Sequence, residues 1–321
     1  MDASDTASPR VISLLGDDEG RERQEVVEGL LQAPARLSPK YFYDELGCAL
    51  YGAICRLPEY YLTRTERAVF ERHGAEIALA AGRGRVLVDL GAGDGRKAED
   101  WFATLGPWRY VAVDIAEHEI RRALARLARD YPGIEMLGVA TDFSQRFDIG
   151  DALGEGPVTF FYPGSSIGNF APGEALTLLS AIHRRCGKGG GLLIGVDGKK
   201  DAARLDAAYD DALGVTAAFN RNCLLHLNRR FGFDFDVGSF AHRGFYNGAL
   251  GRIEMHLEAS RDNEVHLGTA TRRFEIGERI HTENSYKYYR AEFERLLRDS
   301  GFAHVRTWES DCASYFVFFA S

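Results

Sequence analysis

Alternating glycines follow an acidic residue in the first half of the chain, a pattern suited to holding a small ligand. Residues 86–88 are apolar and predict a short buried strand, and Asp89 follows them. Gly91, Gly93 and Gly95 then allow the backbone to turn tightly and to approach a ligand closely. The run after the glycines is amphipathic, so the turn lies where a strand passes into a helix. Open α/β sheets bind their ligands at such positions, and we expect a ligand site here.

Two further predicted strands end in side chains that suit a nucleoside. Residues 110–113 are apolar and lead into Asp114, which stands at a suitable distance from the glycines to bind ribose hydroxyls. The next strand ends at Asp142 and Phe143, where a carboxylate and a ring can flank an adenine. Arg96 stands where the dinucleotide fingerprint requires glycine, which disfavours a pyrophosphate ligand. The pattern resembles the S-adenosylmethionine site of class I methyltransferases; the glycines alone are also consistent with an ordinary βα turn.

The stretch 41–64 is unusually rich in aromatic residues. We expect most of these rings to form a hydrophobic pad against the main domain. Alternatively, some of them form a lid over a small cationic substrate, because ring faces attract an ammonium group and phenol hydroxyls can orient it. The aromatic residues are Tyr41, Phe42, Tyr43, Tyr51, Tyr60 and Tyr61.

The composition excludes several classes of protein. Apolar residues make up 45% and charged residues 27% of the chain, as in globular proteins. The net charge is −8, from 39 basic and 47 acidic residues, so non-specific nucleic-acid binding is not expected. No apolar run is long enough to cross a bilayer, and the polar N-terminus is not a signal peptide. The five cysteines and nine histidines show no metal-binding spacing, so we expect free thiols, no metal and a cytoplasmic location.

Strands and helices alternate from about residue 85 to residue 197, which predicts a doubly wound parallel sheet. A helix over 286–298 and strands over 302–308 and 315–319 supply the last elements of a class I methyltransferase core. The intervening residues look like an insertion. Within it we expect helix over 199–231, broken at 219–222, and a strand over 252–258 with 265–267 and 272–276 as its neighbours.

The chain is therefore expected to form an α/β Rossmann-like core with a second, α+β, substrate-binding domain. Residues 61–197 plus 286–321 are assigned to the core, and residues 1–60 plus 198–285 to the second domain. The substrate is expected between the two, a common place for ligand sites.

Several stretches outside the generic core resemble the histidine-specific methyltransferase family, the histidine Nα-methyltransferases of ergothioneine biosynthesis. The resemblance runs from about residue 25 to the C-terminus. It implies S-adenosylmethionine-dependent trimethylation of the α-amino group of L-histidine, giving hercynine. The matching stretches are 57–64 (LPEYYLTR), 164–169 (GSSIGN), 208–211 (AYDD), 214–222 (GVTAAFNRN), 252–255 (RIEM) and 282–285 (TENS).

The resemblance also implies a role for particular residues. The positions around S-adenosylmethionine are Tyr43, Gly91, Gly93, Lys97, Asp114, Asp142 and Phe143. The positions of the histidine pocket are Tyr51, Tyr60, Gly164, Asn169, Tyr209, Met255, Glu283 and Ser285, with Tyr51 and Gly164 near the amino group. Of all these, the expected catalytic residues are Tyr43, Asn169 and Tyr209. The family often has Phe where Tyr51 stands, so the role of this hydroxyl is open.

These roles agree with the chemistry of the side chains. The Asn169 amide offers donors and an acceptor, and the Tyr209 phenol can donate to a carboxylate. Glu283 and Ser285 are two apart on a predicted extended segment, so both face one way and suit an imidazole. Met255 is predicted on the apolar side of its strand. Taken singly, Met255 is equally consistent with core packing, Tyr209 with a buried helix position and Glu283 with a surface acid.

Two other functions stay open. The acceptor can be another amino acid, such as a tryptophan derivative, although Glu283 and Met255 favour imidazole over indole. The protein can also be a non-catalytic regulator that binds S-adenosylmethionine. No residue is an obvious general base for the amine. We expect a small-molecule substrate and a monomer, without nucleic acid or membrane.

Overall fold

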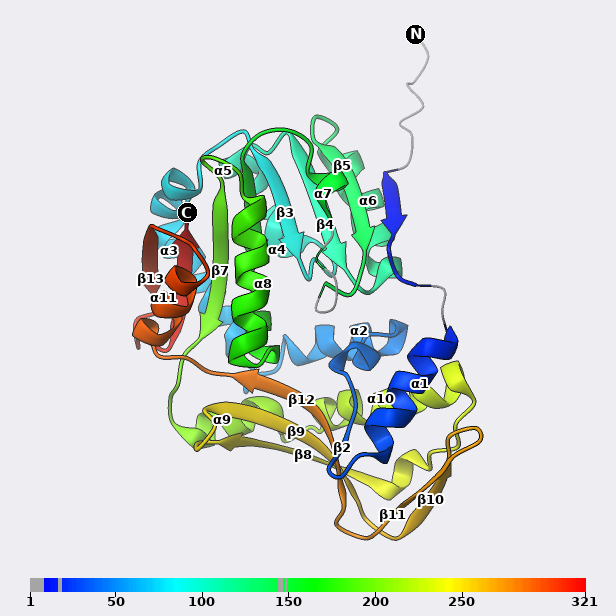
Figure 1. Cartoon of the computed structure of the whole chain (residues 1–321). Coiled ribbons are helices and arrows are strands. Elements are labelled where there is room, and N and C mark those ends of the chain that lie inside the picture. The colour runs from blue at the N-terminus through cyan, green and yellow to red at the C-terminus, as the bar shows by residue number, and fades with distance from the viewer. Residues whose placement is uncertain (1–8, 17–18, 144–146, 148) are drawn as a thin grey trace.

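The computed structural model describes residues 9–16, 19–143, 147 and 149–321, and an eight-stranded sheet forms its centre (Figure 1). The strand order is β1-β5-β4-β3-β6-β7-β14-β13, with the last two strands antiparallel and the others parallel. From β3 the chain adds strands on one side and then on the other, so the carboxyl end of β3 lies at a topological switch point. The bounds are β1 (Arg10–Ser13), β3 (Val86–Leu90), β4 (Arg109–Asp114), β5 (Glu135–Ala140), β6 (Val158–Tyr162), β7 (Gly191–Asp197), β13 (Val305–Glu309) and β14 (Tyr315–Ala320).

Helices cover both faces of this sheet, as the alternation of strands and helices predicts. Leu87 packs in a cluster with α3, α5 and α6, whereas its neighbours Val86 and Val88 pack with α7, α8 and α11 on the other face. Because both faces are covered, β3, β6 and β7 are buried along their whole length. The helices are α3 (Leu62–Ala81), α4 (Arg96–Glu99), α5 (Phe102–Leu105), α6 (Glu117–Asp130), α7 (Gly150–Leu153), α8 (Pro172–Arg185) and α11 (Arg290–Asp299).

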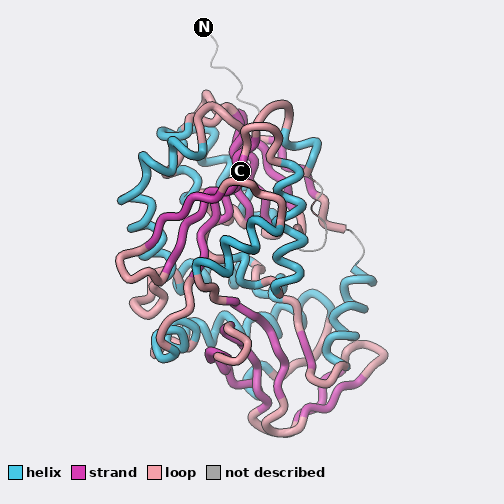
Figure 2. The backbone as a smooth tube through the Cα atoms, turned by 60° about the vertical axis from the view of Figure 1, so that its left-hand side comes forward, coloured by secondary structure: helices cyan, strands magenta, loops and turns pink. Residues whose placement is uncertain are grey.

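A second, four-stranded sheet lies below the carboxyl ends of the large sheet, with its own helices against it (Figures 1 and 2). Its order is β2-β12-β9-β8, and α9 and α10 pack against it. The α2 helix contacts α10. Its elements are β2 (Ala35–Arg36), β8 (Phe240–Asn247), β9 (Arg252–Ala259), β12 (Arg279–Tyr286), α1 (Glu19–Leu31), α2 (Glu45–Ile54), α9 (Ala202–Tyr209) and α10 (Val215–Phe231), with the 3-10 turns η1 (Pro39–Phe42) and η3 (Val237–Ser239). The 3-10 turn η2 (Ser166–Asn169) follows β6 of the large sheet and contacts β12.

One N-terminal strand lies in the large sheet, in contrast to the expected grouping of residues 1–60 with the insertion. The β1 strand pairs in parallel with β5, with Val11 opposite Gly138, and the Leu14 amide extends the ladder to the Ala140 carbonyl. Without β1, the backbone groups of β5 at this edge would be unpaired.

The helical break in the insertion lies at residues 210–214, so the expected break at 219–222 is wrong. Gly214 has a φ of +73°, and the Asp211 carboxylate accepts hydrogen bonds from the amides of Val215 and Thr216 at the start of α10. Asn220, which looked like a turn residue, is fully buried inside α10. The side-chain amide of Asn220 forms hydrogen bonds with β8 and β9 of the small sheet, and not with its own backbone.

Two further expectations need correction. The strands β10 (Asn263–His266) and β11 (Thr271–Phe274) form a sheet of their own, so the neighbours of β9 are β8 and β12. The expected helix from residue 286 begins instead at Arg290, because Tyr286 still pairs with Arg252 in the sheet.

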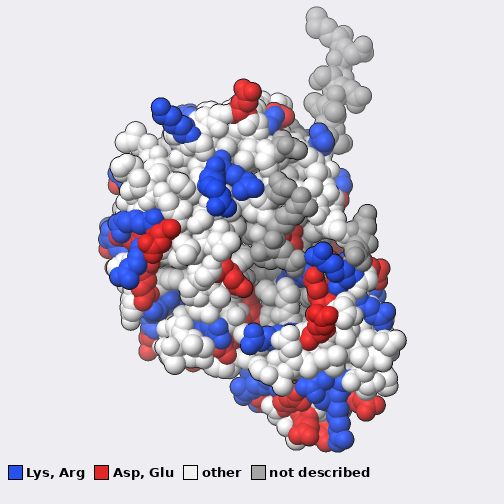
Figure 3. All heavy atoms as spheres, viewed as in Figure 1, with Lys and Arg blue, Asp and Glu red and all other residues white. Residues whose placement is uncertain are grey.

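The surface mixes charges, and the thiols are unpaired. Acidic and basic side chains are interspersed on the face drawn in Figure 3, and no broad basic patch is visible there. All five cysteines are free. Among the described residues, no helix combines the length and apolar character needed to cross a membrane.

Candidate active site

The glycine turn joins β3 to α4 at the switch point of the large sheet. Gly91 and Gly93 have φ values of +70° and +51°, and a Cβ added at either would meet no atom within 4 Å. The turn therefore has open space beside it, as close approach of a ligand requires. Asp114, at the end of β4, accepts hydrogen bonds from the Gly93 and Ala116 amides, both at 2.9 Å. The carboxylate has further lone pairs, so it can also accept from a ribose hydroxyl.

The next strand end carries the acid and the ring that the sequence indicated. Asp142 lies after β5, with Lys40 Nζ 4.0 Å from its Oδ2. The Phe143 ring packs edge-on against Tyr162 at 5.9 Å between centroids. Both residues follow the carboxyl end of β5, on the same side of the sheet as the glycine turn.

A cavity lies between the two sheets and collects every residue expected for the histidine pocket. It opens among the loop after β6, α2, α9, α10 and strands β9 and β12. Lys97, which is expected to contact the cofactor, lies next to Gly164 in the cavity wall: a Cβ added at Gly164 would be 3.0 Å from Lys97 Nζ. The lining residues are Tyr43, Tyr51, Ile54, Tyr60, Gly164, Ser165, Ser166, Asn169, Ala208, Tyr209, Thr216, Phe219, Met255, Glu283 and Ser285.

A β-bulge brings Glu283 to the cavity. In the pairing of β12 with β9, His281 lies opposite His256 and Glu283 opposite Met255, so Thr282 is the additional residue. Glu283 and Met255 therefore sit side by side on the cavity wall. Without the bulge, the alternation of strand side chains would place Glu283 on the other face.

Asn169 and Glu283 meet across the cavity although they are far apart in sequence. The Asn169 Nδ2 donates to Glu283 Oε1 at 3.3 Å. A Cβ at Gly168 would lie 2.8 Å from the Tyr286 carbonyl oxygen, so only glycine lets η2 pack this closely on β12. Burial raises the pKa of Glu283 to about 7, against the lowering effects of Lys287 and Asn169.

The aromatic stretch divides between the two expected roles. Tyr41 and Phe42 are buried core residues. Tyr43, Tyr51 and Tyr60 instead form a chain of edge-on rings along the cavity, with centroids 6.1 and 6.5 Å apart. The α2 helix that carries Tyr51 is capped by Asp44, which accepts from the Gly47 amide.

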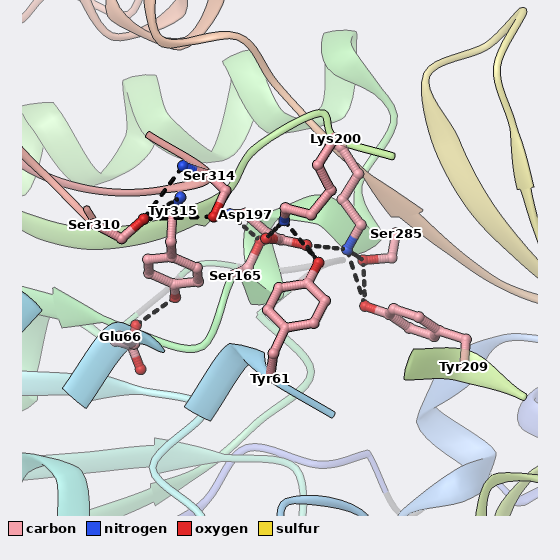
Figure 4. Close-up of polar contacts among 11 residues, drawn as sticks. Tyr61, Glu66, Ser165, Asp197, Lys200, Tyr209, Ser285, Ser310, Ser314 and Tyr315 are labelled. Atoms are coloured by element: carbon pink, nitrogen blue, oxygen red, sulfur yellow. Dashed lines mark hydrogen bonds and ion pairs between the residues drawn. The ribbon is translucent and has the colours of Figure 1, made fainter. Parts of the chain in front are cut away.

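A buried polar network lies behind Tyr209 and Ser285 (Figure 4). Tyr209 donates to Ser285 Oγ at 2.9 Å, and Lys287 Nζ donates to the two hydroxyl oxygens at 3.0 and 2.9 Å. Lys287 Nζ also lies 3.0 Å from Asp197 Oδ2, and neither side chain is exposed. Asp197 further binds Lys200 and the Tyr61 hydroxyl.

A second buried acid joins the two expected ligand sites. Glu66, only 2% exposed, accepts from Lys97 Nζ at 2.8 Å, the Gly164 amide at 2.7 Å and the Tyr315 hydroxyl at 2.6 Å. Lys97 belongs to the expected cofactor set and Gly164 to the expected substrate set. Glu66 therefore fixes the distance between them.

Sequence reasoning missed Glu66, Asp197 and Lys287 as site residues. Two of them carried a usable signal: Asp197 ends β7 as Asp114 ends β4, and Lys287 is two residues beyond Ser285. Glu66 carried none, because it is one acid among several on an amphipathic helix.

One group of metal-ligating side chains lies on the opposite face of the small sheet. Ligand atoms of Glu254, His256 and His281 lie within 4.8 Å of one another. Glu254 is bound by Arg252 at 2.7 Å and by His256 at 3.0 Å. This cluster is held together by its own hydrogen bonds, and we assign no metal to it.

The fold and the glycine turn define an S-adenosylmethionine-dependent methyltransferase of class I. The family model described as "Histidine-specific methyltransferase, SAM-dependent" matches residues 22–321, and the chain belongs to this family.

Several relatives have been named for their activities. A Mycobacterium tuberculosis protein named histidine N-alpha-methyltransferase is 37% identical over 313 residues, which cover 95% of this chain and 97% of the relative. The protein of the same name from Mycolicibacterium smegmatis is 37% identical over 91% of this chain and 92% of its own length. The L-tryptophan methyltransferase of Psilocybe serbica is 27% identical over 91% of this chain and 90% of its own.

Proposed function

We propose that this protein transfers methyl groups from S-adenosylmethionine to the α-amino nitrogen of L-histidine, giving hercynine in ergothioneine biosynthesis. The observation that carries the proposal is the cavity in which Asn169, Tyr209, Glu283 and Ser285 meet beside Gly164. These groups complement a carboxylate, an amine and an imidazole.

In the proposed complex, the two ends of histidine bind two neighbouring sets of residues, because Asn169 contacts Glu283 and Tyr209 contacts Ser285. Glu283 and Ser285 face the imidazole, with Met255 against its ring. Asn169 and Tyr209 bind the carboxylate and amine. Burial raises the pKa of Tyr209, so its phenol keeps its proton at neutral pH and can donate to the carboxylate.

In the proposed complex, the amine of histidine faces the row of tyrosine rings and the glycine turn after β3. Burial raises the pKa of Tyr43, which likewise remains a neutral phenol. Tyr43, Tyr51 and Tyr60 surround the nitrogen, and their ring faces favour the quaternary ammonium product. Gly164 leaves room beside the nitrogen.

The cofactor is proposed to lie along the carboxyl ends of β3, β4 and β5. S-adenosylmethionine, when bound, supplies the methyl group as an electrophile. Gly91 and Gly93 allow its close approach, Asp114 accepts from the ribose, and Asp142 and Phe143 flank the adenine. Lys97 lies where the turn meets the cavity. Catalysis then consists chiefly of holding the sulfonium methyl in line with a neutral amine.

We propose that the parts of the chain around the two sheets bind different ligands. Residues 61–197 plus 286–321, with Arg10–Ser13 added, are proposed to bind the cofactor. The remainder of 1–60 together with 198–285 is proposed to bind the amino acid. We further propose that the protein is a monomer and that it is located in the cytoplasm. Size-exclusion chromatography with light scattering would test the monomeric state.

The test is a direct assay with purified protein. With S-adenosylmethionine in excess, L-histidine should gain the mass of three methyl groups. Mass spectrometry of the reaction mixture measures this gain. Calorimetry in the presence of S-adenosylhomocysteine should rank histidine above tryptophan. Stronger tryptophan binding would favour the other acceptor class, and cofactor binding without turnover of either would favour a regulator.

A further inference from the structure

We propose that Lys287 is a positioning residue that acts through Tyr209 to make a free α-carboxylate a requirement of the substrate. The proposal rests on the proposed function, in which the histidine carboxylate contacts Tyr209. It adds the source of positive charge that holds this carboxylate, which no residue lining the cavity supplies.

The contacts of Lys287 show that it acts indirectly. Its side chain is fully buried and does not line the cavity. Its ammonium group has three N–H donors, and Tyr209, Ser285 and Asp197 lie at 3.0, 2.9 and 3.0 Å. All three donors are thus occupied by the protein, and none remains for a ligand.

The hydroxyl of Tyr209 can carry this charge to the ligand. Because its oxygen accepts from an ammonium group, its own O–H bond is polarised and becomes a stronger donor. In the structure this hydrogen points to Ser285 Oγ. A carboxylate in the cavity is a better acceptor than a serine hydroxyl, so the phenol turns to it while Lys287 holds Ser285.

The charges behind this wall do not cancel. Lys287 and Lys200 both pair with the single carboxylate of Asp197, and all three side chains are almost fully buried. The two lysines thus outnumber the one carboxylate paired with them, and Glu283, whose pKa burial raises to about 7, offsets the excess positive charge next to Tyr209 only in part. Burial lowers the pKa of Lys200 to about 8, against the raising effect of Asp197, so this excess is largely kept at neutral pH.

The excess charge predicts which ligands bind. A free amino acid places its carboxylate against this wall and is attracted. Histamine has the same imidazole and amine but no carboxylate, and L-histidinamide has a neutral group there. In a buried site the attraction is little screened by salt, so the discrimination should persist at moderate ionic strength.

The experiment measures binding of L-histidine, L-histidinamide and histamine by calorimetry in the presence of S-adenosylhomocysteine. Lys287→Met should weaken histidine binding about tenfold or more, as expected for loss of a charge-assisted hydrogen bond, and change histamine binding less than about twofold. Affinity for S-adenosylhomocysteine should not change. The matched control is Lys199→Met, which removes a partly exposed lysine paired with Glu292 outside the network.

Tyr209→Phe keeps the proposal testable if Lys287→Met, which removes one of the two lysines paired with Asp197, fails to fold. This variant retains the Lys287–Asp197 pair and removes only the relay atom, and it should lose histidine affinity selectively as well. Equal losses of histidine and histamine in either variant would assign a merely structural role and overturn the proposal. If the unmodified protein binds none of the three ligands, the proposed function itself fails.

Discussion

The Glu66 carboxylate accepts a hydrogen bond from the backbone amide of Gly164 at 2.7 Å. Its other oxygen accepts from Lys97 at 2.8 Å. One buried side chain on α3 thus holds both the glycine that is proposed to face the reacting amine and the lysine at the cofactor turn. In-line methyl transfer depends on the distance between the two ligands, so Glu66 is a point where positioning can be tested.

Substitutions of Glu66 should distinguish the effect of its contact with Lys97 from the effect of its contact with Gly164. Glu66→Gln keeps an oxygen that can accept from Gly164 but turns an amide N–H toward Lys97, which then loses its charged partner. We expect S-adenosylhomocysteine affinity to fall about tenfold while histidine affinity changes little, measured by calorimetry. Glu66→Ala removes both contacts and should weaken both ligands.

Tyr315→Phe is the control for this pair, because it removes a neutral donor from Glu66 without changing its charge or its bond to Lys97. It should retain cofactor affinity. If Glu66→Gln weakened both ligands equally, Glu66 would support the fold as a whole and not the cofactor side.

The ribose contact predicts a selective effect at Asp114. Asp114→Ala should reduce affinity for S-adenosylhomocysteine about tenfold or more, because it removes the acceptor for ribose and frees the Gly93 amide that shapes the turn. Histidine affinity measured at saturating cofactor should stay close to that of the unmodified protein. Asp94→Ala, at an exposed position of the same turn, is the control. An unchanged cofactor affinity in Asp114→Ala would refute the ribose role.

The sequence was sufficient for the core because its signals are local. Short apolar runs ending in Asp89 and Asp114 predicted two of the strands, and the alternation of strands and helices up to residue 197 predicted a parallel sheet. The helix expected over 286–298 corresponds to α11, although its start was placed too early.

The sequence was insufficient where a partner distant in the chain decides the outcome. Arg10–Ser13 forms a strand only because β5 offers an unpaired edge. The bulge at Thr282 depends on the β9 pairing and has no local signal. Lys287 becomes a site residue only through Asp197, 90 positions earlier in the numbering.

Asn220 is the clearest example of a residue whose conformation depends on tertiary contacts, and its replacement should reduce stability. Its Nδ2 bonds His242 Nδ1 at 2.8 Å and the His256 carbonyl at 3.0 Å, and its Oδ1 accepts from Thr282 at 2.8 Å. Asn220→Ala removes these three buried hydrogen bonds, although Thr282 keeps its bond to the Met255 carbonyl. It should lower the free energy of unfolding by about 2–4 kcal/mol, measured by urea denaturation.

The neighbouring Arg221→Ala is the control for helix propensity, since its guanidinium makes only a 3.3 Å contact with the Ala217 carbonyl of its own helix. This variant should cost less than about 1 kcal/mol. Histidine binding should also weaken in Asn220→Ala, because Thr282 precedes Glu283 at the bulge. Equal destabilisation by the two substitutions would contradict the role given to the Asn220 amide.

Glu283 predicts a pH dependence of stability in the ligand-free protein. Burial raises its pKa from 4.5 to about 7 in the folded state. Between these two values the folded protein binds a proton that the unfolded chain has lost, so the free energy of unfolding falls as pH rises. The penalty from Glu283 is absent below about pH 4.5 and complete above about pH 7, where it amounts to about 3 kcal/mol.

Glu283→Gln isolates this effect because it resembles the protonated acid and does not titrate. The variant should match the unmodified protein near pH 4.5 and exceed its stability by up to about 3 kcal/mol at pH 8, measured by urea denaturation at intervals of pH. Asp89, whose burial also raises its pKa to about 7, is present in both proteins and cancels in the difference. A difference in stability that is constant across this pH range would show that Glu283 does not titrate as a buried acid. Histidine binding should nevertheless weaken in the variant, because the amide offers the imidazole a weaker acceptor than the carboxylate does.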